Sequence, residues 1–272
     1  MSMASSYFLA VDIGNTHTVS GVYKGEKLVS DWRISSDASR TEDETGLVLI
    51  QFLHAAGLKP GQIGSVGISS VVPDMTKGMV EAGRKYFRCD PLVIGSGLDL
   101  GIKIVYDDPA SVGADRLCDA VAGFAKYGGP LIIVDFGTAT TYDLIDGEGN
   151  YLGGVISPGI ETSAAGLHRR AAKLPRVELR LPKRVVGTNT TESMQSGILY
   201  GAIDATEGMV QRLQRELVQI AGKRGRVIAT GGFSQFVAKH SKVIEAVEPT
   251  LVLDGVRLIC ARQRPRPRPA QD

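Results

Sequence analysis

The stretch LAVDIGNTHTVSGVYKGEKLV, residues 9–29, returns in a second form as LIIVDFGTATTYDLIDGEGNYLGGVI, residues 131–156. In each copy an apolar run ends in an aspartate, Asp12 or Asp135, followed by one residue, a glycine and small hydroxyl residues. Such an apolar run is typical of a buried strand, and a glycine just after it is typical of a tight turn. Two such loops, facing each other, would hold a polyphosphate from both sides.

The elements that follow each copy also correspond. In the first half, strands at 7–14, 18–24 and 27–35 precede a helix over about 42–56, a strand at 65–72, a helix after Pro73 and a strand at 91–95. In the second half, strands at 131–137, 140–146 and 151–157 precede helices, including one over about 191–221, then a strand at 226–232, a short helix near Phe236 and a final strand at 251–259. Thr41 and Glu44 have the spacing of a capping box. Asp and Gly favour strand-to-turn junctions by themselves, so two similar turns can arise by chance. The matching order nevertheless favours a duplicated α/β fold with mixed sheets covered by helices.

Composition limits the class of protein. A chain of 272 residues with 43% hydrophobic residues is large enough for one or two domains. The net charge of +2 gives no general basic field, so sequence-independent nucleic-acid binding is not indicated. The three cysteines have no paired spacing, which favours a reducing compartment and argues against a zinc cluster. With no leader-like or membrane-length apolar segment, we expect a cytoplasmic protein that does not enter a membrane.

Domain boundaries follow from the repeat. We expect two related domains, one over 1–116 with the first loop and one over 117–262 with the second loop. The first residues, MSMASS, and the Arg- and Pro-rich tail at 263–272 have compositions typical of disordered segments.

The loop after Asp12 has the residue types that phosphate binding requires. Gly14, Asn15 and Thr16 can present backbone N–H groups with little side-chain bulk, and the Thr hydroxyl adds a donor. The Asp12 carboxylate would repel phosphate, so we expect it to hold a hydrated magnesium ion that bridges the phosphate oxygens.

The second loop repeats this surface. Gly137, Thr138 and Thr140 again offer amides and hydroxyls, and Asp135 offers a second hard oxygen ligand for a cation. No GxxxxGK followed by Ser or Thr occurs in the chain, which excludes a P-loop kinase. The segment GSGLDLG, residues 95–101, lacks the final spacing of a dinucleotide turn and is interpreted as a loop.

A third acidic residue begins a predicted helix. Leu117, Val121 and Phe124 have helical spacing, and glycines follow at 128 and 129, so Asp115 falls in the first turn. With an ordinary pKa of about 3.9 it is ionised at neutral pH and can accept a hydroxyl proton. Alternatively, it only complements the helix dipole. Arg116 has a planar fork suited to a carboxylate ligand, or it forms a surface ion pair.

Six short motifs carry a family resemblance that covers nearly the whole chain before the tail. DIGNT (12–16), DFGTATTYD (135–143) and ATGG (229–232) resemble the two phosphate motifs and the adenosine motif of the acetate and sugar kinase, Hsp70 and actin superfamily. With YDDPASVGADR (106–116), GGVISPG (153–159) and GTNT (187–190), they resemble the type III pantothenate kinase family. By its own residue types GGVISPG either shapes a loop or lets a ligand approach the backbone, and ATGG is either an adenosine site or a plain turn.

The resemblance implies a fold and a function. The fold would be two duplicated ribonuclease H-like domains, each in the order βββαβαβ. The function would be ATP-dependent phosphorylation of pantothenate to 4'-phosphopantothenate, the first step of coenzyme A biosynthesis. The alternatives are another small-molecule kinase of the same superfamily and a non-catalytic nucleotide-binding regulatory factor.

The resemblance also implies roles for individual residues. ATP would contact Asp12, Ile13, Gly14, Asn15, Thr16, His17, Thr18, Val19 and Thr138. Pantothenate would contact Tyr106, Gly113, Ala114, Asp115, Arg116 and Thr190, with Asp115 as the general base. Asp135 would bind a monovalent cation, K⁺ or NH₄⁺, and Mg²⁺ would accompany ATP. The partners implied are these substrates and a second copy of the chain in a homodimer, with no nucleic acid and no membrane.

Overall fold

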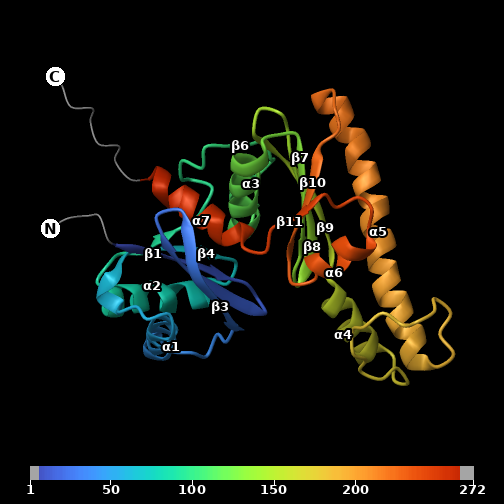
Figure 1. The fold of residues 1–272 in the computed structure, drawn as a ribbon, viewed down its shortest axis with the longest axis horizontal. Helices are drawn as coiled ribbons and strands as arrows, with labels where there is room; N and C mark the ends of the chain where they lie inside the picture. Colours follow the sequence, from blue (N-terminus) through green and yellow to red (C-terminus); the bar gives the residue numbers. More distant parts are fainter. Residues whose placement is uncertain (1–5, 264–272) are drawn as a thin grey trace. The chain divides into compact units, whose positions relative to one another are not determined.

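The structure, a computed structural model, describes residues 6–263, which form two compact units (Figure 1). The first unit consists of the chain up to Ile102, residues Asp107–Ala122, and the stretch from Leu251 onward. The second unit consists of Lys103–Tyr106 and Gly123–Thr250. The expected disordered ends, apart from residues 6 and 263, lie outside the described residues.

The first unit is built on a five-stranded mixed sheet. Its strands are β1 (Tyr7–Ile13), β2 (His17–Lys24), β3 (Lys27–Ser35), β4 (Ile63–Ser70) and β5 (Leu92–Val93), in the order β3-β2-β1-β4-β5. β1 is antiparallel to β2 and parallel to β4, so the end of β1 lies between two neighbours. Any residue there is positioned from both sides.

Helices cover both faces of this sheet. α1 (Glu42–Ala55) and α2 (Pro73–Phe87) pack against apolar residues of β1 and β4, including Leu9, Val11 and Ile68. The capping box predicted at the start of α1 is confirmed, because Thr41 Oγ1 accepts from the Glu44 N–H at 3.2 Å and Glu44 accepts from the Thr41 N–H at 2.8 Å. Short 3₁₀ turns at Pro60–Gln62 and Pro109–Ser111 precede β4 and α3 (Ala114–Tyr127).

The prediction of a final strand at residues 251–259 is wrong. This segment is the helix α7 (Leu251–Arg262), and the strand at this point of the repeat is the short β11 (Ala246–Val247). The buried residues Leu251, Val256, Ile259 and Cys260 are spaced for one face of a helix rather than for a strand. α7 lies close to α3, where a Cβ on Gly255 would be 2.1 Å from the carbonyl oxygen of Cys118.

The second unit repeats the strand order of the first. Its strands are β6 (Lys103–Ile104), β7 (Leu131–Phe136), β8 (Ala139–Ile145), β9 (Asn150–Pro158), β10 (Arg226–Gly231) and β11, in the order β11-β10-β7-β8-β9-β6. Without β6, the order from β9 to β11 matches the order from β3 to β5, with the same parallel and antiparallel pairings. The predicted duplicated α/β fold is therefore confirmed, and β6 is an added edge strand.

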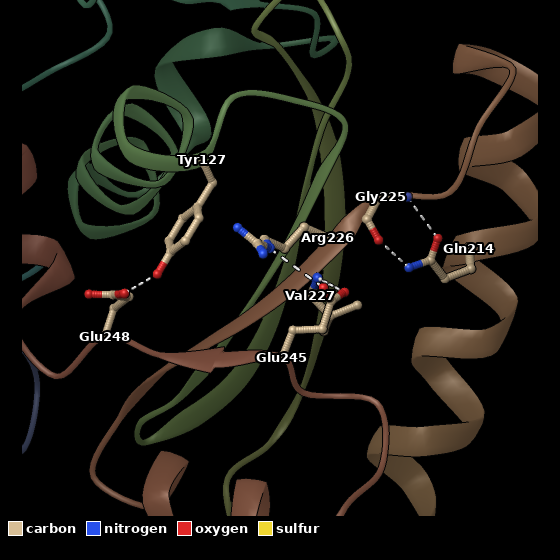
Figure 2. A network of polar contacts seen from close by, with 7 residues as sticks. All are labelled: Tyr127, Gln214, Gly225, Arg226, Val227, Glu245 and Glu248. Carbon is tan, nitrogen blue, oxygen red and sulfur yellow. Dashed lines mark hydrogen bonds and ion pairs between the residues drawn. The ribbon is translucent and has the colours of Figure 1, made fainter.

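The helices of the second unit pack mainly on one face of its sheet. They are α4 (Ile160–Arg170), α5 (Thr190–Ala221) and α6 (Ser234–His240), joined by the end of α3 on the opposite face. Apolar residues of α5, among them Leu199, Val210 and Leu217, belong to this core. Figure 2 shows how Gln214 of α5 holds the start of β10, donating to the Gly225 carbonyl at 2.6 Å and accepting from its N–H at 2.9 Å. Within residues 6–263, no helix has the length and apolar character needed to span a membrane.

Candidate active site

Asp12 lies at the end of β1, beside a serine that the sequence did not reveal as a partner. In the parallel pairing of β1 with β4, Asp12 is aligned with Ser69, and on the other side it is aligned with Val19 of β2. The fully buried Ser69 donates from Oγ to Asp12 Oδ1 at 2.8 Å. The carboxylate is thus fixed by a donor that has no access to water.

The surroundings of Asp12 disfavour its negative charge. The pKa of Asp12 is raised to about 7, mainly because of burial and secondly because of the nearby charge of Asp115, while the Ser69 hydrogen bond acts in the opposite direction. The structure therefore brings Asp12 and Asp115 together within the first unit. Two partly buried carboxylates near each other offer oxygen ligands that suit a hydrated divalent cation. The positive charge of the cation would relieve the repulsion between the two carboxylates.

The loop after β1 is braced from the end of β3. Gly14 donates its N–H to the His17 carbonyl at 3.0 Å, Ser36 Oγ donates to the Gly14 carbonyl at 2.6 Å, and the Ser36 N–H donates to the Thr16 carbonyl at 2.9 Å. Asn15, Thr16 and His17 are exposed at its tip. The Gly14 N–H is therefore used within the loop instead of being presented to a phosphate as predicted, while the tip at Asn15 to His17 stays open to a ligand.

Other residues of this predicted ATP loop have inward-facing side chains. Ile13 is 1% exposed and belongs to the core below α1 and α2, so only its backbone can meet a ligand. Thr18 is also buried, and its Oγ1 lies 3.0 Å from Ser36 Oγ. Val19 is partly buried on β2. These three positions support the loop rather than extend its tip.

Asp115 lies in the first turn of α3, as the sequence predicts. Its Oδ1 accepts from the Arg116 N–H at 2.8 Å, and a Cβ on Gly113 would lie 2.4 Å from the same oxygen. Burial raises the pKa of Asp115, while the Arg116 amide and the Arg116 charge lower it. Ala114 and Arg116 are buried, so the interpretation of Arg116 as a surface ion-pair residue is wrong.

Asp135 occupies the matching place in the second unit. It lies near the end of β7, aligned with Thr230 of the parallel strand β10 and with Thr141 of β8. Gly231 has φ +86°, and a Cβ there would be 2.2 Å from Asp135 Oδ1. Part of the ATGG motif therefore makes room for Asp135.

The loop after β7 is shaped by the GGVISPG segment. Gly159 donates its N–H to the Thr138 carbonyl at 3.1 Å, and a Cβ on Gly159 would lie 2.3 Å from the Gly137 carbonyl oxygen. Thr162 Oγ1 donates to the Thr138 carbonyl at 2.5 Å. Gly137 and Thr138 themselves are exposed. Of the two readings of GGVISPG, the structure supports a loop-shaping role for Gly159.

Two predicted substrate residues lie elsewhere in the second unit. Tyr106 directly follows the edge strand β6, and its side chain is 39% exposed. Thr190 is the first residue of α5, after the N-cap Asn189. It lines a cavity of about 600 Å³ between β8, β9, α4 and α5, together with apolar residues and the hydroxyls of Thr140, Ser157 and Thr206.

The described residues offer few protein ligands for a metal. Over residues 6–263, no group of three or more His, Cys, Asp or Glu side chains is placed to hold an ion. A cation at Asp12 or Asp135 would therefore need water, backbone or substrate oxygens as its remaining ligands, which is typical of magnesium bound with nucleotide phosphates.

Sequence reasoning missed the residues that support this site. Ser69 and Ser36 hold Asp12 and the first loop, and Gly159 and Gly231 shape the second. The only signal for Ser69 is its place near the end of the strand expected to pair with β1, and choosing it over Ser70 requires the strand register.

Comparison of the sequence with known proteins identifies one family. The profile described as Type III pantothenate kinase matches residues 8–212. A curated protein of Geobacter sulfurreducens named Type III pantothenate kinase is 47% identical over 256 residues, covering 94% of this chain and 99% of that protein. One of Bacillus cytotoxicus with the same name is 47% identical over 252 residues, covering 93% and 95%.

Solved structures agree on the fold. A putative Baf family transcriptional activator of Campylobacter jejuni has a TM-score of 0.54 and 18% identity, covering 93% of this chain and 98% of its own. Component A of the Acidaminococcus fermentans (R)-2-hydroxyglutaryl-CoA dehydratase has a TM-score of 0.54 and 12% identity, covering 94% and 96%. At these identities the likeness extends to the fold alone.

Proposed function

This chain belongs to the type III pantothenate kinase family, which phosphorylates pantothenate with ATP and a divalent metal in coenzyme A biosynthesis, and from that premise we propose that Asp115 is the base of the transfer. The observation that supports the role of Asp115 is its position near Asp12, close enough for its negative charge to raise the pKa of Asp12. An acid placed only to complement a helix dipole needs no such neighbour.

The proposed reaction is an in-line transfer. The primary hydroxyl oxygen of pantothenate attacks the γ-phosphorus of ATP, the bond from that phosphorus to the bridging oxygen breaks, and ADP leaves. The hydroxyl proton passes to the Asp115 carboxylate. Because phosphoryl transfer proceeds through a loose transition state, aligning the hydroxyl and neutralising phosphate charge provide most of the acceleration.

ATP binding is assigned to the two loops. We propose that ATP is bound by the loop from Asp12 to Val19, with its phosphates at the exposed tip, and by Thr138 of the second unit. The exposed tip at Asn15, Thr16 and His17 supports this assignment, as does the bracing by Ser36. Bound Mg²⁺ supplies positive charge to the phosphate oxygens, and Asp12 is the residue that would hold its water shell.

Pantothenate binding is assigned to Tyr106, Gly113, Ala114, Arg116 and Thr190, in addition to Asp115. Arg116 pairs with the pantothenate carboxylate in this assignment, because a planar guanidinium matches that anion in two parallel hydrogen bonds. Its burial supports a role in binding rather than on the surface.

Further parts of the proposal concern ions and assembly. Asp135 would bind K⁺ or NH₄⁺, supported by its place at the strand end that matches Asp12.

The enzyme would be a homodimer in the cytoplasm. Two exposed apolar residues near the end of α5, Val218 and Ile220, support an interface with a second copy. The three cysteines are free, which suits a reducing compartment. We keep 1–116 and 117–262 as the proposed domains.

The activity is tested by coupled ADP release with a panel of acceptors. Pantothenate should give ADP and a product heavier by one phosphoryl group, while sugars and short acids should give none. ADP release with a sugar alone would favour another kinase of the superfamily. Nucleotide binding without ADP release for any acceptor would favour the regulatory factor.

A further inference from the structure

We propose that Tyr151 and Gly153 of β9 are positioning residues that fix the Tyr106 ring for pantothenate. The inference rests on the proposed function in one respect, the assignment of Tyr106 as a substrate contact. It adds two residues that have no role in that assignment. All three lie in the second unit.

The backbone delivers Tyr106 to this place. The edge strand β6 pairs in parallel with β9, with Lys103 aligned with Asn150 and Ile104 aligned with Tyr151. The Val105 N–H then donates to the Tyr151 carbonyl at 2.8 Å. Tyr106 is the next residue, so its Cα is held beside β9 before its side chain makes any contact.

Gly153 leaves the space that the Tyr106 ring occupies. A Cβ on Gly153 would lie 3.2 Å from Cε2 and 3.3 Å from Cδ2 of Tyr106, which is tighter than ordinary van der Waals contact. Gly153 also has φ +119°, where a side chain is strained. A residue with a side chain at this position would therefore displace the ring and strain the strand.

Tyr151 supports the ring from the interior. Its ring centroid is 6.3 Å from that of Tyr106, with the planes tilted by 56°, a favourable aromatic geometry. Tyr151 is completely buried and donates its hydroxyl to Asp143 Oδ1 at 2.6 Å, and Asp143 is also completely buried. A short hydrogen bond in the interior holds the Tyr151 ring in one orientation.

The arrangement explains a motif residue that the reaction itself does not use. Asp143 closes the motif DFGTATTYD, yet no step of the transfer requires it. Through Tyr151 it acts on Tyr106, which remains 39% exposed and so presents a fixed aromatic surface to a ligand. A ring held in advance loses less conformational freedom on binding, which strengthens affinity without changing the chemical step.

The test compares steady-state constants of Tyr151→Phe and Gly153→Ala with matched controls. Tyr127→Phe removes a tyrosine hydroxyl that donates to another carboxylate, Glu248 (Figure 2). Gly222→Ala places a side chain at φ +72° with nothing within 4 Å. We expect each test variant to raise the KM for pantothenate about three- to tenfold, with kcat and the KM for ATP within about twofold of wild type. The controls should leave all three constants unchanged.

Two further variants separate the positioning role from the substrate contact. Tyr106→Ala should raise the KM for pantothenate at least as much as Tyr151→Phe, and the double variant should add little to Tyr106→Ala alone. An unchanged KM in Tyr106→Ala would overturn the substrate contact and the positioning role together. A raised KM in Tyr106→Ala with an unchanged KM in Gly153→Ala and Tyr151→Phe would overturn the positioning role alone. If Tyr151→Phe does not fold, Gly153→Ala and its Gly222→Ala control decide the question.

Discussion

Ser69 donates a hydrogen bond of 2.8 Å to the carboxylate of Asp12, and the two residues are aligned on the parallel strands β4 and β1. The donor is fully buried, so no water replaces it when it is removed. Asp12 also experiences the charge of Asp115, the proposed base. Ser69 therefore influences the orientation of the Asp12 carboxylate. It also lowers the pKa of Asp12, which opposes the effect of the Asp115 charge.

Ser69→Ala should weaken MgATP use more than pantothenate use. Loss of a hydrogen bond to a charged group is worth about 1.5–3 kcal/mol, so we expect kcat/KM for MgATP to fall about 10- to 100-fold. The KM for pantothenate should change less than about twofold. Steady-state kinetics with each substrate varied gives both values. Ser65→Ala, on the same strand but aligned with Phe8, is the control and should behave as wild type. Equal losses in the two variants would contradict a specific role for Ser69.

Asp12→Asn should stabilise the ligand-free protein at high pH. The pKa of Asp12 rises from 3.8 to about 7 in the folded state, so stability from this group is present below pH 4 and is lost as the pH rises through 7. With chelator present, the variant should gain on the order of 4 kcal/mol over wild type at pH 8 and almost nothing at pH 4, because each pKa unit corresponds to about 1.4 kcal/mol. Thermal unfolding across this range measures it, with Asp204→Asn as an exposed control. A constant difference between variant and wild type at all pH values would contradict the raised pKa.

Asp135→Asn should change the response to monovalent cations. Wild-type activity should rise with added K⁺ or NH₄⁺, and the variant should need at least about tenfold more of either ion, because a carboxylate ligand has lost its charge. The measurement is ADP release against salt concentration at fixed ionic strength. The control is again Asp204→Asn, which replaces an exposed carboxylate on α5. Its activity should respond to K⁺ and NH₄⁺ as the wild-type activity does. A K⁺ response that is the same in Asp135→Asn and wild type would remove the proposed role of Asp135.

Gly231→Ala should lower activity beyond its effect on folding. An alanine there would meet Asp135 Oδ1 and would also sit at a positive φ, so both the carboxylate and the strand end must shift. The backbone cost alone is about 1 kcal/mol, and Gly222→Ala, at φ +72° in open space, measures that cost separately. We expect a lower unfolding temperature in Gly231→Ala than in Gly222→Ala, because only the first meets other atoms, and a kcat about tenfold lower in Gly231→Ala only. Equal kcat values in Gly231→Ala and Gly222→Ala would show that Gly231 is needed only for its backbone conformation.

The sequence predicted those parts of the structure that depend on local pattern. The two copies of the strand ending in Asp12 and Asp135 are built as expected, and so is the capping box at Thr41. Each of these signals is contained within a few residues. The apolar residues of 251–259 form a near-continuous run that suggests a strand, but their spacing fits one face of a helix.

The supporting residues that the sequence does not predict depend on which residues pair between strands far apart in the chain. Ser69 is 57 residues from Asp12, and only the pairing of β1 with β4 shows that they meet. Likewise, the contact of Tyr106 with Gly153 depends on β6, an edge strand of two residues that carries no periodic signal. Resemblance to a family supplied the substrate residues, whereas the residues that hold them in place came only from the structure.

The most direct test of the central claim is the kcat of Asp115→Asn with ATP and pantothenate both saturating. Asparagine keeps an oxygen that can accept from the Arg116 N–H, so the start of α3 should remain intact. The account predicts a kcat about 10²- to 10⁴-fold lower, with product still identified as 4'-phosphopantothenate. Asp74→Asn, an acid in the first turn of α2, controls for the helix dipole and should keep full activity. A kcat for Asp115→Asn within about twofold of wild type would contradict the assignment of Asp115 as the base.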